Sequence, residues 1–279
     1  MENLPESGSA QQRPTANSRL SRHRRIIETA ARRGRVSVDE LVAMLDVTPQ
    51  TIRKDLNDLC SRGVLSRTHG GAVLGSGTEN VGYEARRFLQ RDVKRAIGEA
   101  AADRIPDGAS LFINIGTTTE EVARALARRS GLLVITNNLN VVDILIGNGG
   151  IEVIVVGGRV RHSDRAAIGP SAVEFIRGFK VDYAIIGTSA IDEDGSLLDF
   201  DLNEVQVSHA IVANARSTIL VADQSKLSRN APVRVGHMKS IDIFVTDPIE
   251  SERLAESCEM NEVRVVAVST ESREGTSVS

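Results

Sequence analysis

Tryptophan is absent from this 279-residue sequence, and aromatic residues make up only 3% of it, so the core must be built from Val, Ile, Leu and Ala. Long apolar runs are missing too, because no stretch approaches the roughly 20 residues that a membrane-spanning helix needs. Residues 1–17 are polar and lack the apolar segment of a secretory signal. With 41% hydrophobic and 25% charged residues, the composition is that of an ordinary soluble protein, and we expect a cytoplasmic location.

Metal and dinucleotide sites find little support in the sequence. The two cysteines, Cys60 and Cys258, lie far apart and match neither a disulfide framework nor a zinc-ligand spacing, so both are expected to be reduced thiols. An acidic turn, Asp192-Glu-Asp-Gly195, lacks the spacing of a calcium-binding EF-hand loop. The glycine-rich stretches do not form G-x-G-x-x-G after a strand. We therefore expect no metal and no cofactor.

Charge is distributed unevenly along the chain. Residues 1–75 contain twelve Arg or Lys and eight Asp or Glu, a net charge of +4, which leaves −7 for the remainder of a chain whose total is −3. A basic head on an acidic body suits a head that binds a polyanion, because neutralising phosphates releases condensed counterions. A charge of +4 over 75 residues also arises by chance, so charge alone does not decide this.

Residues 19–74 have the pattern of a small winged helix-turn-helix domain that follows a disordered tail over residues 1–17. Three helices are expected: one over residues 19–33, one that Ser37 and Glu40 open as a capping box, and one that Thr48 and Pro49 open and that ends near Gly63. Residues 64–69 then alternate like a strand, and Gly70-Gly71 supplies a tight turn for a hairpin. Residues 75–91 are interpreted as a linker.

Short apolar strands alternate with helical stretches from residue 92 onward. The expected strands cover residues 110–113, 132–135, 151–156, 182–186, 217–221 and 241–245, with helices such as 120–129, 139–146 and 203–215 between them. This alternation predicts an α/β domain over residues 92–250 with a largely parallel sheet that is covered on both faces. A last helix and a possible strand at 263–268 are expected in the C-terminal segment 251–279, whose end should be a tail.

The candidate DNA-binding residues lie on the third helix and on the hairpin. In a helix-turn-helix, the N-terminal residues of the second motif helix reach base edges in the major groove. Gln50, Thr51, Arg53 and Lys54 would face solvent there, and Gln and Arg can pair with adenine and guanine through two hydrogen bonds. Arg67 and His69 on the hairpin, and Ser37 at the preceding helix start, complete the candidate set. Each residue alone is equally compatible with a solvated surface.

Two motifs in this region make the chain resemble the DeoR-type family of transcriptional repressors. They are Thr51-Ile-Arg-Lys-Asp-Leu56 and Arg67-Thr-His-Gly-Gly-Ala72, with Lys54 where the family usually has a second Arg. The resemblance continues to about Asp247. Four segments carry it there: Leu111-Phe-Ile-Asn-Ile-Gly-Thr-Thr118, Ile135-Thr-Asn-Asn-Leu-Asn-Val141, Gly187-Thr-Ser-Ala-Ile-Asp-Glu-Asp-Gly-Ser-Leu-Leu-Asp-Phe-Asp201 and Asp223-Gln-Ser-Lys226. The family implies a repressor of a carbon-catabolic regulon that binds double-stranded operator DNA.

Polar residues follow several of the expected strands, at the edge where parallel sheets bind ligands. Gly116, Thr117 and Thr118 open a helix, whose free amides make an anion site, although small residues there also serve as an ordinary cap. The equivalent turns carry Asn137 with Asn138, and Gly157 with Gly158, and Lys226 offers a cation to the same rim. Asp199, Asp201 and Glu204 are candidates for accepting hydrogen bonds from ligand hydroxyls, or else form a solvated loop.

The family resemblance implies that this site is an effector-binding pocket. It implies a sensor domain similar to ribose-5-phosphate isomerase, with a phosphate near Thr117 and Thr118 and with Lys226 and Asn137 close by. It also implies release from the operator by a small phosphorylated effector, glycerol-3-phosphate or another sugar phosphate. Residues 75–92 are the natural place for that change to be passed on. We expect a homo-oligomer without membrane attachment, since helix-turn-helix proteins usually bind repeated half-sites.

An enzyme is the competing interpretation. A sugar-phosphate isomerase carrying a DNA-binding head would need a carboxylate base within hydrogen-bond reach of the abstracted proton. Asp199, Asp201, Glu204 and Asp223 are candidates for that base. The repressor is preferred, with no catalytic residues, because a head that reads DNA favours a sensor and the same carboxylates also serve ligand binding.

Overall fold

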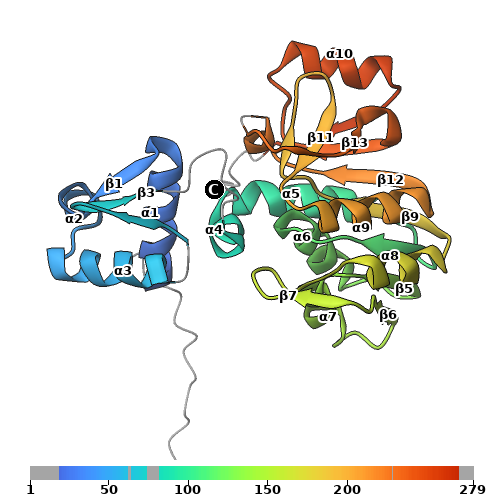
Figure 1. Cartoon of the computed structure of the whole chain (residues 1–279), viewed down its shortest axis with the longest axis horizontal. Helices are drawn as coiled ribbons and strands as arrows, with labels where there is room; N and C mark the ends of the chain where they lie inside the picture. The colour runs from blue at the N-terminus through green and yellow to red at the C-terminus, as the bar shows by residue number, and fades with distance from the viewer. Residues whose placement is uncertain (1–18, 62–63, 74–81, 228, 270–279) are drawn as a thin grey trace, which may run out of the picture. The chain divides into compact units, whose positions relative to one another are not determined.

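The computed structural model describes residues 19–61, 64–73, 82–227 and 229–269 and divides the chain into two compact units, residues 1–76 and 77–279 (Figure 1). The tail predicted for residues 1–17, the helix end predicted near Gly63 and residues 75–81 of the predicted linker lie outside the described residues. None of the described helices is both long and apolar enough to cross a membrane.

Unit 1 is a three-helix domain with a small antiparallel sheet. Its elements are α1 (Arg19–Arg33), β1 (Arg35–Ser37), α2 (Val38–Leu45), α3 (Pro49–Ser61), β2 (Ser66–Thr68) and β3 (Gly71–Val73), with strand order β1-β3-β2. Ile26, Ile27, Leu41, Ile52 and Leu56 are fully buried between the helices. The aliphatic core that the sequence implied is therefore present in this unit.

The predicted caps of unit 1 are found, and the hairpin gains a third strand. Ser37 Oγ accepts a hydrogen bond from the Glu40 amide, and Thr48 Oγ1 accepts one from the Thr51 amide, which fixes the starts of α2 and α3. β1 was not expected as a strand, and it pairs with β3 opposite Gly71. A Cβ atom at Gly71 would lie 2.0 Å from the Val36 carbonyl oxygen, so only glycine lets these two strands approach.

Unit 2 is built on a seven-stranded sheet in which every neighbouring pair is parallel. Its strand order is β15-β14-β12-β9-β4-β5-β6. The strands are β4 (Ser110–Ile113), β5 (Leu132–Thr136), β6 (Ile151–Val155), β9 (Val181–Ile186), β12 (Ala215–Val221), β14 (Ile243–Thr246) and β15 (Arg264–Ala267). All seven strands expected from the apolar runs are present, which confirms the predicted α/β class.

Helices cover both faces of this sheet. α5 (Arg91–Ala102), α6 (Thr117–Leu126) and α7 (Leu139–Leu145) bury one apolar cluster with the sheet, which includes Leu111 and Ile113. α8 (Pro170–Arg177), α9 (Leu202–Ala213) and α10 (Glu252–Met260) bury the other, which includes Phe112. Successive β4 residues thus point into opposite cores, as strand geometry requires.

Several elements of unit 2 have no counterpart in the sequence prediction. They are the hairpin β7 (Arg159–Arg161) with β8 (Ala166–Ile168), helix α8, and a small antiparallel sheet of β10 (Ala190–Ile191), β11 (Ser196–Asp199) and β13 (Val233–His237). Two 3₁₀ turns, η1 (Gln224–Lys226) and η2 (Met238–Ser240), also belong here. Strands of two to five residues are too short for alternation in the sequence to reveal them.

The segment predicted as a linker, residues 75–91, contains a helix. α4 (Tyr83–Phe88) packs on α6, and its Tyr83 and Ala85 are buried. The segment was interpreted as a linker because of its glycine and serine content, which is confined to residues 75–82. A single buried tyrosine in so short a helix leaves no periodic signal. The described part of this segment therefore belongs to unit 2.

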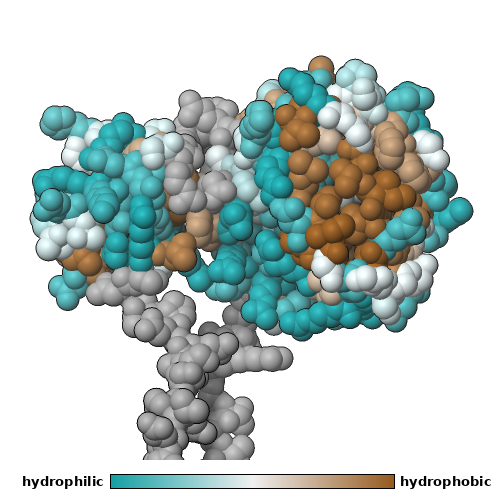
Figure 2. Space-filling model, turned by 90° about the horizontal axis from the view of Figure 1, so that it is seen from below, coloured by the Kyte–Doolittle hydropathy of each residue, from teal (hydrophilic) through white to brown (hydrophobic). Residues whose placement is uncertain are grey.

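Unit 2 also has an uncovered sheet edge. β6 ends the strand order, and Val155 on it is exposed, as are Ile146 and Val160 on either side of it in the sequence. A continuous apolar patch is visible on one face of this unit (Figure 2). Apolar patches of this kind mark interaction surfaces more often than chance.

Candidate functional site

A pocket opens in unit 2 next to β4, where the strands that follow in the chain are added first on one side of the sheet and then on the other. After β4 the chain continues to β5 and β6 on one side, whereas β9 and β12 lie on the other. Loops that leave neighbouring strands toward opposite faces form a crevice at their carboxyl ends. Fifteen residues line this pocket: Tyr83, Arg86, Ile115, Gly116, Thr117, Thr118, Thr119, Asp164, Gly187, Thr188, Ser189, Asp199, Glu204, Val221 and Lys226.

One end of the pocket is suited to an anion. Gly116 is the N-cap of α6, and no side chain caps this helix among the described residues, so the amides of its first turn remain available. Lys226 from η1 and Arg86 from α4 line the same pocket. Helix N-termini and cations together are the usual surroundings of a phosphate group.

Lys226 is the most unusual of these groups. Its side chain is 7% exposed, and among the described residues its Nζ makes neither a hydrogen bond nor an ion pair. Burial lowers the pKa of Lys226 to about 7, against the opposing charge of Asp223, and Arg229, Lys94 and Arg86 lower it further. A buried ammonium surrounded by other cations is stabilised when an anion enters.

Asp223 is the carboxylate whose negative charge most strongly opposes the lowering of the Lys226 pKa. Burial would raise the pKa of Asp223, but the charges of Lys226 and Lys94 and hydrogen bonds from Ser225 lower it below its usual value. Its Oδ2 atom is buried and has no hydrogen-bond partner among the described residues. The same holds, within the described part of the chain, for Arg86 Nε. Such unsatisfied groups are costly, and they indicate a site whose polar contacts are incomplete without a ligand.

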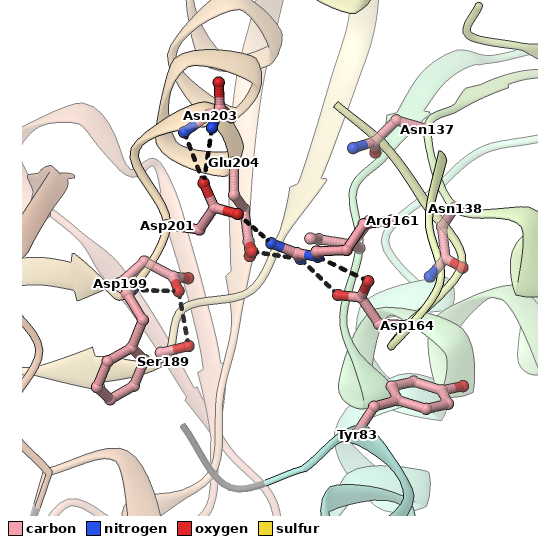
Figure 3. A network of polar contacts seen from close by, with 12 residues as sticks. Tyr83, Asn137, Asn138, Arg161, Asp164, Ser189, Asp199, Asp201, Asn203 and Glu204 are labelled. Atoms are coloured by element: carbon pink, nitrogen blue, oxygen red, sulfur yellow. Dashed lines mark hydrogen bonds and ion pairs between the residues drawn. The ribbon is translucent and has the colours of Figure 1, made fainter. Parts of the chain in front are cut away.

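Carboxylates gather at the other end of the pocket around Arg161 of the β7–β8 hairpin (Figure 3). Arg161 donates to Asp164 Oδ1 at 2.9 Å, to Asp201 Oδ2 at 2.7 Å and to Glu204 Oε2 at 2.6 Å. Burial and the negative charge of Asp199 raise the pKa of Glu204, and Arg161 opposes this. The guanidinium thus ties the hairpin to the start of α9.

The carboxylate end can accept hydrogen bonds from hydroxyl groups. Asp164 and Glu204 line the pocket, as does Asp199, whose Oδ1 already accepts from Ser189 Oγ at 2.9 Å. The cavity volume is only about 30 Å³, against roughly 300–1,000 Å³ for pockets that enclose small ligands. Parts of the lining must therefore move apart when a ligand enters.

In unit 1, the exposed side of α3 carries the candidate DNA contacts. Gln50, Arg53 and Lys54 are exposed, while Ile52 and Leu56 are fully buried on the opposite side. Arg67 on β2 and His69 in the β2–β3 turn are exposed as well. The helix therefore presents a polar, basic side, as a recognition helix does.

A buried ionic network fixes α3 against α1. Asp55 of α3 is 2% exposed and accepts hydrogen bonds from Arg22 Nε at 2.7 Å and Arg22 Nη2 at 3.2 Å. His23 Nε2 lies 3.0 Å from Asp55 Oδ1. Burial would raise the pKa of Asp55, but Arg22 and His23 lower it below its usual value. Asp55 thus orients the recognition helix from its buried side.

Family models match both units. A DeoR-like helix-turn-helix domain matches residues 22–78, and a DeoR C-terminal sensor domain matches residues 89–248, more than half of the chain. The chain belongs to the DeoR family of helix-turn-helix transcriptional repressors. The family predicted from the motifs at residues 51–56 and 67–72 is therefore confirmed.

Curated relatives of this DeoR-family chain are similar over most of their length. The glycerol-3-phosphate regulon repressor of Escherichia coli (strain K12) is 44% identical over 226 residues, 81% of this chain and 90% of its own. The protein of that name from Haemophilus influenzae is 46% identical, over 82% of this chain and 89% of its own. The transcriptional repressor CsqR of E. coli is 40% identical, over 88% of this chain and 94% of its own.

Among solved structures, the chain is similar to ribose 5-phosphate isomerase from Plasmodium falciparum, with a TM-score of 0.36 and 16% identity. The match covers 50% of this chain and 53% of that one, so the DeoR-family chain spans about half of the isomerase. Ribose 5-phosphate isomerase A from Methanocaldococcus jannaschii gives a TM-score of 0.38 at 17% identity, over 50% of this chain and 55% of that one.

The pocket of this DeoR-family protein contains six of the ten residues predicted for the effector site. These are Gly116, Thr117, Thr118, Asp199, Glu204 and Lys226. Asp201 contributes indirectly, through Arg161.

The remaining four predicted effector residues lie outside the lining. Asn137 Nδ2 donates to the Ala167 carbonyl, and Asn138 caps α7, so both hold the chain at the end of β5. Gly157 and Gly158 are exposed and lead into the β7–β8 hairpin. Both asparagines follow β5 at the carboxyl edge of the sheet, and Asn138 Nδ2 lies 3.4 Å from Glu120 Oε1, which also accepts from Tyr83, so this turn lies beside the pocket lining.

Nine of the fifteen lining residues were not among the candidates from the sequence, and four of them show why. Arg86 and Tyr83 come from α4, which was interpreted as linker, and Asp164 and Ser189 come from elements that were too short to predict. A basic residue shortly before a buried helix is too common a pattern to single out Arg86. Only the packing of α4 against α6 brings it to the pocket.

All seven candidate DNA-binding residues lie on the surface of unit 1, but two are already engaged. Ser37 Oγ caps α2, and Thr51 Oγ1 lies 2.9 Å from Thr48 Oγ1 at the start of α3. Gln50, Arg53 and Lys54 extend from the first turns of α3. Among the candidates, these three are the best placed for base or phosphate contacts.

Proposed function

We propose that this protein represses a carbon-catabolic regulon in the cytoplasm by binding operator DNA through α3 and the β2–β3 hairpin. Its release is triggered by a phosphorylated metabolite, for which glycerol-3-phosphate is the first candidate. The pocket around Lys226 carries the proposal: it combines a buried ammonium that has no partner among the described residues, the open start of α6, and carboxylates that can accept hydrogen bonds.

Glycerol-3-phosphate has the matching chemistry. Its phosphate dianion suits the cationic end, where Lys226, Arg86 and the α6 amides meet. Its two hydroxyls suit Asp199 and Glu204 at the other end. The names of the E. coli and H. influenzae relatives favour the same molecule among phosphorylated metabolites. A larger sugar phosphate needs a wider opening of the cavity.

A gel-shift titration of the full chain tests this assignment. Operator-containing DNA, taken from the promoter region beside the gene, is bound first and then titrated with glycerol-3-phosphate, fructose 6-phosphate, ribose 5-phosphate and inorganic phosphate. Glycerol-3-phosphate is expected to release the DNA at the lowest concentration. Release by another of these phosphates alone would overturn the effector assignment and leave the repressor function standing.

Arg53 is expected to make a base contact. Replacing Arg53 with Ala should cost about 1–3 kcal/mol of operator binding and relax the preference at one base pair. The variant Arg35→Ala, which removes an exposed Arg outside the recognition helix, serves as the control. A uniform loss on unrelated DNA sequences would instead identify Arg53 as a phosphate contact. Competition gel shifts with operator and scrambled duplexes separate these results.

We also propose that two copies pair through β6. An apolar edge strand can extend its sheet across a two-fold axis, and β6 pairs with β5 alone among the described strands. Ile146 before β6 and Val160 after it in the sequence are also exposed. The other edge, β15, begins with the exposed charge of Arg264. Val155→Lys should therefore lower the molecular mass found by light scattering, while Val265→Lys on β15 should not. An unchanged mass in Val155→Lys would exclude β6 as the interface.

The pocket is proposed to bind its ligand without turnover. Glu204 is held by Arg161, and Asp199 by Ser189 and the Phe200 amide, which suits positioning of a ligand rather than transfer of its protons. Incubation with ribose 5-phosphate and other aldose phosphates should leave them unchanged. Conversion to the ketose would establish an isomerase instead.

A further inference from the structure

Helix α4 stands between the pocket and the chain that leads to unit 1. Residues 74–81 connect α4 directly to the hairpin of unit 1, and Arg86 on α4 lines the pocket. A displacement of α4 would therefore change both the lining of the pocket and the start of the connection to the DNA-binding unit.

A few polar contacts hold α4 in place. Tyr83 Oη donates to the buried Glu120 carboxylate of α6, at 2.7 Å from Oε1 and 2.8 Å from Oε2. Lys94 of α5 is 4% exposed, and its Nζ donates to the carbonyl oxygens of Arg86 at 2.5 Å and Leu89 at 2.7 Å. The ammonium thus caps the carboxyl end of α4, where the last carbonyl groups of a helix lack partners.

The other walls of the pocket are less free to move. Gly116 to Thr119 and Gly187 to Ser189 directly follow β4 and β9, which are central strands of the sheet. α6 is further fixed by α5, since a Cβ atom at Gly98 would lie 2.6 Å from the backbone carbon of Glu121. α4 has only six residues, and Tyr83, the buried Ala85 and the Lys94 contacts hold it. We expect it to move first when a ligand enters a cavity this narrow.

We propose that α4 transmits effector binding to the DNA-binding unit: Arg86 contacts the anionic group of the effector, and the ligand displaces α4 from the position that Tyr83 and Lys94 maintain. The proposal rests on the function proposed above. Arg86 Nε, which is buried without a partner, gains one in the complex. The hydrogen bond between Tyr83 and Glu120 then favours the DNA-binding state. By thermodynamic linkage, operator DNA weakens effector binding by the same factor by which the effector weakens operator binding.

Tyr83→Phe separates coupling from binding, because it removes the bond to Glu120 and keeps the ring. In the full chain, we expect this variant to bind glycerol-3-phosphate at least as tightly as the wild type in calorimetry. We expect its operator affinity without ligand to fall, so that the ratio of operator Kd values with and without ligand shrinks at least fivefold. The chain supplies a matched control in Tyr183→Phe on β9, which should behave like the wild type.

Arg86→Gln tests the ligand contact, with the exposed Arg91→Gln at the start of α5 as control. Arg86→Gln should weaken glycerol-3-phosphate binding at least tenfold, while Arg91→Gln should leave it within twofold. The transmission proposal fails if the wild type responds to the ligand and Tyr83→Phe responds equally, or if Arg86→Gln binds normally. A wild type that none of the phosphates releases from DNA would instead refute the proposed function. Thermal unfolding of each variant checks that it is folded.

Discussion

Replacing Lys226 with Met is expected to give a repressor that binds its operator normally and no longer responds to its effector. The ammonium is almost fully buried, and we place it against the phosphate group of the ligand. Loss of a hydrogen bond between two charged groups should weaken effector binding about 10- to 100-fold. Gel-shift titration and calorimetry measure the two properties separately. Unchanged release of DNA by the ligand would remove Lys226 from the site.

The same variant should be more stable without ligand. The pKa of Lys226 is about 7 in the folded chain and about 10.4 in an unfolded one. The unfolded state therefore holds the proton more strongly, and the buried lysine costs stability at low pH, a cost that disappears as pH rises from about 7 toward 10.4. At pH 7, Lys226→Met should raise the free energy of unfolding by about 4 kcal/mol, since each unit of pKa difference corresponds to about 1.4 kcal/mol; differential scanning calorimetry detects this as a higher Tm.

Effector binding by the wild type should weaken as pH rises above about 7, since a dianion favours the protonated lysine. Lys226→Arg is the control, because a guanidinium keeps its charge at every accessible pH. That variant should lose the decline in affinity between pH 7 and 9. A wild type with constant affinity over this range would contradict the assignment of Lys226 to the phosphate.

Asp55→Ala is expected to destabilise unit 1 and to abolish operator binding. Removal of the carboxylate leaves Arg22 and His23 without their buried partner, and breaking such a pair costs about 3 kcal/mol. Hydrogen exchange of the α1 and α3 amides reports on this unit separately from unit 2. Exchange there should accelerate by about two orders of magnitude, while the α5 and α6 amides should be unaffected.

Glu28→Ala provides the matched control, because it removes a carboxylate of the same unit from a half-exposed pair with Arg24. Its effect should stay below about 0.5 kcal/mol. The pKa of Asp55 is lowered in the folded state, so its stabilisation is present above the unfolded pKa of about 3.9 and is lost as pH falls through the folded value. A normal exchange pattern in Asp55→Ala would mean that the apolar core alone orients α3.

The elements that carry long or well-marked patterns could be predicted from the sequence. The capping residues Ser37 and Thr48, with Pro49 after it, marked helix starts through local hydrogen bonds that involve only three or four residues. The seven strands of the sheet were visible as apolar runs, because the inner strands are buried on both faces, although the edge strands β6 and β15 are partly exposed. The proposed anion site at the start of α6 followed from the same logic, since α6 begins shortly after such a strand.

Other features could not be predicted, because their cause lies in contacts between distant residues. Tyr83 and Glu120 are 37 positions apart, and Arg161 and Glu204 are 43 positions apart. Asn137, Asn138, Gly157 and Gly158 have the residue types of a ligand-binding turn, but the inserted β7–β8 hairpin gives them other positions. Residue type alone did not show that the turn at Gly116 lines the pocket and that the turns at Asn137 and Gly157 do not.

The sequence alone determined the family, the order of the two units and the α/β class, because these depend on periodicity, on local capping and on motifs of consecutive residues. Tertiary structure alone decided which side chains meet in the pocket and that α4 belongs to it. Charges that face one another across a fold act over a few ångströms in space, and the separation of residues along the chain does not encode that distance.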